Sequence, residues 1–186
     1  MADTQEQITI YKSIFYLKNA SQYTPLVVDG IRTNITGIFD AITLKNLYPA
    51  KYFSQDQWNQ MVLKAIFMER PVYQIEGIDQ RKNEKLALIL FDYARERWAA
   101  SRRVTPELWR MMRGYLTIDQ FLEMKKQMGE SIKPHQEAML KLIKESNLNN
   151  SQQWLNMQSV QLENKNISWD EIGIDFLNKN QALKKS

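Results

Sequence analysis

Six arginines and two tryptophans gather in one short stretch of the chain. The arginines lie between residues 95 and 113, where glutamates at 96 and 107 are the only acidic residues. Guanidinium groups bind phosphate, sulfate or carboxylate through paired donors, and they also stack on indole rings. The stretch therefore predicts a surface for an acidic ligand or a partner protein. Its candidate binding residues are Arg95, Arg97, Trp98, Arg102, Arg103, Trp109 and Arg110.

A purely structural interpretation of the same stretch stays open beside this one. Arg95 can pair with Asp92, and Arg110 with Glu107, at the i,i+3 spacing of ion pairs along a helix. The two tryptophans can equally close the core between two helices. Residue types and spacing alone do not separate the two interpretations.

Carboxylates near this stretch suggest an alternative, an enzyme acting on a phosphorylated or carboxylated small metabolite. Glu76, Asp79 and Glu96 would act as acid or base and the arginines would clamp the substrate. Other catalytic groups are scarce, because the chain has no cysteine and its one histidine, His135, is expected to face solvent at a helix start. Glycine-rich phosphate loops and nucleophile motifs are missing too. We therefore favour a non-enzymatic protein with no metal site and no cofactor.

Length and charge narrow the class of protein. A chain of 186 residues is long enough for one well-buried core. Its net charge of +4 is confined to the arginine stretch, so a nucleic-acid partner is not expected. The polar first residues are unlike a signal peptide, and no apolar run approaches the roughly 20 residues of a membrane-spanning helix. We expect a cytoplasmic protein.

Apolar residues recur mostly at helical spacing, and no long stretch alternates with period two. The clearest helices are expected over 5–19, from Ser54 to Arg70 and over 80–100, where Leu88 and Ile89 broaden the apolar stripe and predict a helix covered on more than one side. Residues 20–50 are ambiguous, with two short helices expected and LYPA (47–50) as a stop. Further helices are expected to begin at Thr105–Pro106, Thr117, Pro134, Asn150 or Ser151, and Ser168.

These elements predict an all-α fold. Short antiparallel helices would stack in pairs in one domain, helical-repeat-like and loosely similar to HEAT repeats. The domain is expected to span residues 1–178, with its core at 54–113 and a polar tail at 179–186.

The stretch 58–112 resembles the EboA-domain family. The resemblance is carried by IEGIDQR (75–81), DYARERWAASRRV (92–104) and TPELWR (105–110), and ISWDEIG (167–173) is similar to the closing motif of the family. It implies a helical accessory protein in the making or moving of specialised metabolites, including export of precursors. Its partners would be other proteins of the same gene cluster or an acidic small molecule. No catalytic residue of the family can be transferred to this chain.

Overall fold

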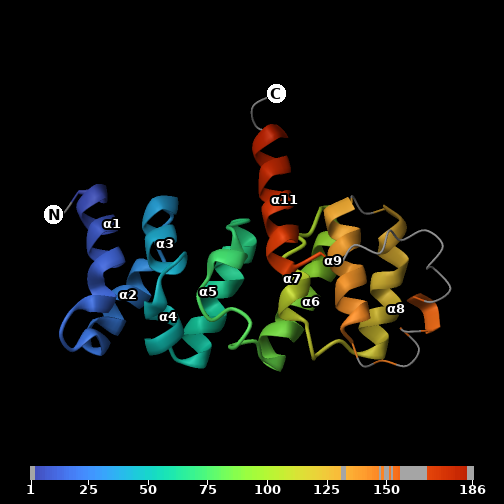
Figure 1. Cartoon of the computed structure of the whole chain (residues 1–186), viewed down its shortest axis with the longest axis horizontal. Coiled ribbons are helices and arrows are strands. Elements are labelled where there is room, and N and C mark those ends of the chain that lie inside the picture. The colour runs from blue at the N-terminus through green and yellow to red at the C-terminus, as the bar shows by residue number, and fades with distance from the viewer. Residues whose placement is uncertain are drawn as a thin grey trace. The chain divides into compact units, whose positions relative to one another are not determined.

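The chain is built from helices. The computed structural model describes residues 3–130, 133–146, 148, 151, 153–155 and 167–183, and all regular elements within these ranges are helical (Figure 1). This confirms the all-α prediction. Two compact units, Met1–Arg81 and Lys82–Ser186, make up the chain and are described one at a time. Across the described ranges, no helix is long and apolar enough to cross a membrane.

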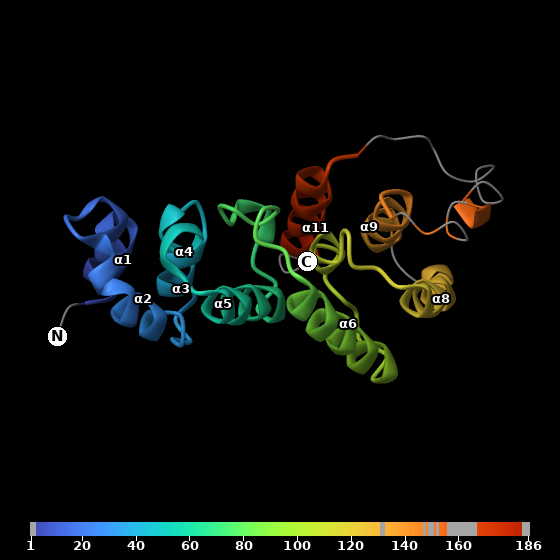
Figure 2. The same cartoon turned by 90° about the horizontal axis from the view of Figure 1, so that it is seen from below.

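The first unit consists of five α-helices and short 3-10 helices, labelled η, that follow one another along the chain (Figure 2). Helix α1 packs against α3, and the large side chains of Phe39, Tyr48 and Trp58 are fully buried. The elements are α1 (Thr4–Ser13), η1 (Ile14–Tyr16), η2 (Ala20–Tyr23), α2 (Thr24–Gly30), α3 (Thr36–Thr43), α4 (Leu47–Tyr52), α5 (Gln55–Phe67) and η3 (Val72–Gln74).

Residues 20–50 differ from the expectation of two short helices with a stop at LYPA. Three α-helices occupy or enter this segment, and LYPA opens α4. Asn46 caps α4, since its side chain accepts a hydrogen bond from the Tyr48 amide at 2.9 Å. Pro49 falls in the first turn of α4, where a missing amide proton costs little. The buried Tyr48 hydroxyl then donates to the Ala20 carbonyl at 2.6 Å.

The IEGIDQR motif closes the end of α4. Gly77 turns the chain there with a φ of +78°, and a Cβ at this position would lie 3.1 Å from the Ala50 Cβ. Arg81 donates to the carbonyls of Pro49 at 2.9 Å, Ala50 at 3.2 Å and Phe53 at 2.9 Å. Carbonyls at a helix end lack partners within the helix, so this guanidinium satisfies them.

The second unit contains α6 (Glu84–Ala99), α7 (Leu108–Met111), α8 (Ile118–Gln127), η4 (Met128–Glu130), α9 (Lys133–Lys144) and α11 (Trp169–Leu183). Helix α7 packs against α6 and α9, and α11 packs against α9. The predicted helix from Asn150 or Ser151 falls largely outside the described residues. The predicted domain limits, including a polar tail from 179, stay a prediction.

Local capping signals correctly gave several helix starts. Thr117 with Gln120 forms a capping box at the start of α8, and Ser168 exchanges hydrogen bonds with Glu171 at the start of α11. Helix α6 begins at Glu84 and not at residue 80 as expected, and Asn83 caps it. That helix also buries one face only.

The exposed face of α6 corrects the expectation of a helix covered on more than one side. Leu88 is 49% exposed and Ile89 38% exposed, whereas Leu86, Leu90 and Ala94 are completely buried. The buried residues share one face of the helix at the usual three- and four-residue spacing.

Candidate functional site

The turn that follows α6 holds the predicted arginine–tryptophan stretch. Ser101 adopts a left-handed conformation with a φ of +53°, which is uncommon outside glycine. The Arg102 amide donates to the Arg97 carbonyl at 2.8 Å, and the Arg97 Nε donates to the Arg103 carbonyl at 2.9 Å. Arg97 therefore holds both ends of the turn in place.

The two tryptophans of the stretch stack beneath this turn. The rings of Trp98 and Trp109 lie 5.6 Å apart at an angle of 22°, and Phe91 meets both edge-to-face at 6.0 and 6.5 Å. Trp109 is fully buried and Trp98 is half-buried. Their contacts are those of a packed core, which gives the turn a rigid base.

Arg95 joins α6 to α8. Its Nε donates to Glu123 Oε2 at 2.8 Å, and its Nη2 donates to Glu123 Oε1. Its Nη1 also donates to Asp92 Oδ1 at 3.2 Å. The hydrogen bond from Arg95 lowers the pKa of Glu123, and the same bond raises the pKa of Arg95. Both donors of the guanidinium fork are therefore bound within the protein.

Two further arginines of the stretch bind acidic residues that come later in the chain. Arg110 is buried and donates to Asp170 at 2.6 Å, while Arg113 Nε contacts Glu145 at 2.8 Å. The Trp169 indole donates to the same glutamate at 3.0 Å. Arg113 lies in the turn after α7 and Glu145 directly follows α9, so these contacts tie α7 and its following turn to α11 and to the end of α9.

Arg102 and Arg103 stand apart from the other four arginines. Both side chains are exposed, and neither forms a hydrogen bond or ion pair with another residue that the structure describes. Two guanidinium groups on a well-held turn can therefore bind a carboxylate or phosphate from outside the protein.

The expectation that a helix begins at Thr105–Pro106 is wrong. Helix α7 begins three residues later, at Leu108, and is only four residues long. Thr105, Pro106 and Glu107 are buried beneath it. A single helical turn aligns few peptide dipoles, and its first position already follows a buried carboxylate.

His135 is buried, which corrects the expectation that it faces solvent. Its side chain is 4% exposed in the first turns of α9, where its ring meets Phe176 edge-to-face at 5.7 Å. Burial, followed by the positive charge of Arg103, lowers the pKa of His135 to about 4. The imidazole is therefore neutral near pH 7.

The three carboxylates of the enzyme alternative lie on different elements. Glu76 and Asp79 belong to the connector that follows η3, and Glu96 lies on α6 in the second unit. Glu76 and Glu96 are exposed, and Asp79 is half-buried. Their role as acid or base stays a prediction.

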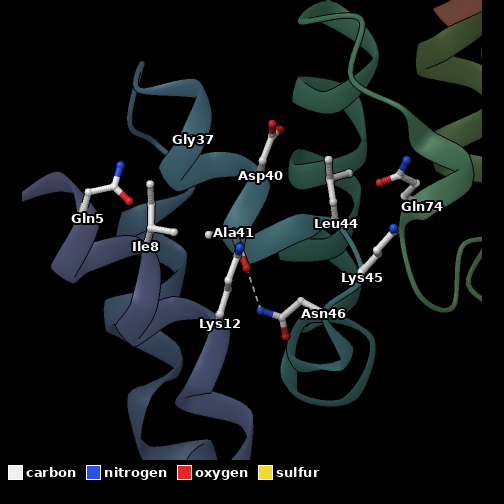
Figure 3. Close-up of a pocket in the computed structure, with 10 residues that line it drawn as sticks. All are labelled: Gln5, Ile8, Lys12, Gly37, Asp40, Ala41, Leu44, Lys45, Asn46 and Gln74. Atoms are coloured by element: carbon white, nitrogen blue, oxygen red, sulfur yellow. Dashed lines mark hydrogen bonds between the residues drawn. The ribbon is translucent and has the colours of Figure 1, made fainter.

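Sequence reasoning missed a pocket in the first unit. Ten residues from α1, α3, the Lys45–Asn46 turn and Gln74 line a cavity of about 650 Å³ (Figure 3). None of the predicted site residues is among them. The signal that could have revealed it is a polar position within each of two helical stripes, at Lys12 on α1 and at Asp40 on α3.

A family comparison covers both the pocket and the arginine turn. The family model described as "Metabolite traffic protein EboA" matches residues 1–113. The chain belongs to the EboA family. The match extends well before 58, where the motifs begin, and the similarity at 167–173 lies outside it and stays a prediction. No curated protein and no solved structure matches the chain significantly.

Apart from Asp92, the acidic partners of the arginines described above lie beyond the part that matches the EboA family. Glu123, Glu145 and Asp170 all follow residue 113. The matched part thus supplies the guanidinium groups, and residues that follow it in this chain supply a carboxylate to three of them.

Proposed function

We propose that this EboA-family chain acts in metabolite traffic as a binding protein without chemistry of its own. Arg102 and Arg103 bind carboxylates on the surface of an acidic partner protein. The description of the family supports the role in traffic. The observation that carries the binding proposal is the contrast between these two exposed arginines and the other four, which hold the fold together.

The turn favours binding because it is already ordered. The side chain of Arg97 and the stacked tryptophans fix its backbone, so only the outer parts of Arg102 and Arg103 lose freedom when a partner docks. Each guanidinium group can bind a carboxylate through two parallel hydrogen bonds. Their shared positive charge also speeds the approach of an acidic surface.

Co-purification from the native cell tests this proposal. The baits are the wild-type protein, Arg102→Ala/Arg103→Ala, and a control that removes the same charge elsewhere, Arg32→Ala/Lys18→Ala. Both control residues are exposed. We expect the wild type and the control to retain the same acidic proteins, which the turn variant loses. Equal recovery of these proteins by all three baits would overturn the proposal.

A further inference from the structure

We infer that the pocket between α1 and α3 binds a small organic anion with an apolar body. All ten lining residues belong to the first unit, so this site is separate from the arginine turn and does not rest on the proposed partner surface. Its charge, its apolar lining and its rigid rim each point to this class of ligand.

Two helical stripes form opposite walls of the pocket. Ile8 and Lys12 lie on one face of α1, and Gly37 and Ala41 lie on one face of α3, at the spacing that brings residues together on a helix surface; Leu44 directly follows α3. In Figure 3 the side chains of Lys12 and Lys45 both extend upward in the view, among the residues that line the pocket.

The pocket carries an excess of positive charge. Asp40 is its one acidic lining residue, and Arg70 binds both oxygens of that carboxylate, at 2.8 and 2.6 Å. Lys12 and Lys45 are exposed, and neither forms an ion pair with a residue that the structure describes. The charge of Asp40 is therefore already balanced, and that of the two lysines is available to an anionic ligand.

The apolar lining fits a hydrocarbon body beside the charged group. Ile8, Ala41 and Leu44 supply it, and Gly37 leaves space because it has no side chain. A Cβ at Gly37 would lie 3.2 Å from the Ile8 Cδ1, so even one methyl group would crowd this wall. A carboxylate or phosphate attached to a short apolar chain or ring matches both parts of the pocket.

The rim of the pocket is rigid where Lys45 projects. Lys45 holds a left-handed φ of +51°, and its amide donates to the Gln74 carbonyl at 2.7 Å. The next residue, Asn46, is buried, and its side-chain Nδ2 donates to the backbone carbonyls of Tyr11 at 3.1 Å and Ala41 at 2.9 Å. A strained backbone held by such bonds is a common feature of ligand sites.

Nuclear magnetic resonance titration of the full chain with sodium octanoate tests the inference. Octylammonium, which has the same apolar chain and the opposite charge, serves as the matched ligand control. We expect octanoate to cause saturable shifts at the amides of Ile8, Gly37 and Lys45, and octylammonium to cause none there. Equal shifts from both compounds, or octanoate shifts confined to other parts of the chain, would overturn the inference.

Variants separate the pocket from a general effect of charge. Lys12→Ala/Lys45→Ala should weaken octanoate binding about tenfold, because two charged contacts are lost. Lys18→Ala/Lys126→Ala removes the same charge from exposed positions outside the pocket and should change the affinity less than twofold. Gly37→Leu should also abolish binding, since it fills the cavity without changing the charge.

Unchanged octanoate affinity in the lysine variant or in Gly37→Leu would contradict the site. Neither variant alters the arginine turn. Failure of the pocket inference in the octanoate titration can therefore be distinguished from failure of the partner proposal in the co-purification.

Discussion

Replacement of Arg81 by methionine should destabilise the first unit. The change removes three hydrogen bonds to the carbonyls of Pro49, Ala50 and Phe53. It also removes the cation that lies 4.6 Å above the Trp58 ring. Methionine keeps much of the apolar stem, so the loss reports mainly on the guanidinium group.

The expected loss follows from these contacts. Each hydrogen bond contributes about 1 kcal/mol net, and the cation–π contact adds about 0.5–1 kcal/mol. Arg81 is only half-buried, so water can reach part of the site and offset some of the loss. We expect the free energy of unfolding to fall by about 3 kcal/mol, a large fraction of the roughly 5–15 kcal/mol typical of a whole protein.

Urea unfolding followed by circular dichroism measures this change. Arg81→Lys keeps the charge but loses the planar fork, and it should be intermediate. Arg32→Met is the matched control, because Arg32 is exposed in the same unit, and it should shift the free energy by less than about 0.5 kcal/mol. A value for Arg81→Met as small as that of the control would refute the role of Arg81 in closing α4.

Three further changes test other parts of the structure. A double-mutant cycle between Arg95 and Glu123 should give a coupling free energy of about 1 kcal/mol in urea unfolding, since the pair is bidentate but partly exposed. The pKa of Glu123 is lowered in the folded protein. The coupling should therefore be present above pH 4.5, the ordinary pKa of this carboxyl, and disappear as the pH falls through its folded pKa. The pKa of His135 is about 4 in the folded protein and 6.5 for an unperturbed histidine. The free energy of unfolding should therefore be highest above pH 6.5 and fall by about 3 kcal/mol on acidification to pH 4. In His135→Leu, a pH series of unfolding measurements should show a smaller fall. Gly77→Ala should lower the melting temperature, because it combines a positive φ with a 3.1 Å approach to Ala50.

Features fixed by neighbouring residues were predictable from the sequence. The capping pairs at Thr117 and Ser168 act within one helical turn, and both were placed correctly. The turn at Gly77 is local as well. Helix α4 was missed because Pro49 indicates a break when read alone, and the contact that anchors Tyr48 reaches a carbonyl 28 residues away.

The roles of the arginines depend on contacts between distant parts of the chain. Arg95 binds a glutamate 28 residues later, and Arg110 binds an aspartate 60 residues later. A charge count over 95–113 therefore overstates the positive charge that is free to bind a partner. The polar positions at Lys12 and Asp40 do not by themselves locate the pocket, because its two walls, α1 and α3, come together only in the folded unit.

Arg102 and Arg103 are proposed to bind the partner, while the other four arginines support the fold. The most direct measurement is the recovery of acidic partner proteins by Arg102→Ala/Arg103→Ala, quantified against the wild type by mass spectrometry, on protein with an unchanged urea midpoint. We predict that recovery falls at least tenfold. Recovery equal to that of the wild type would contradict the claim.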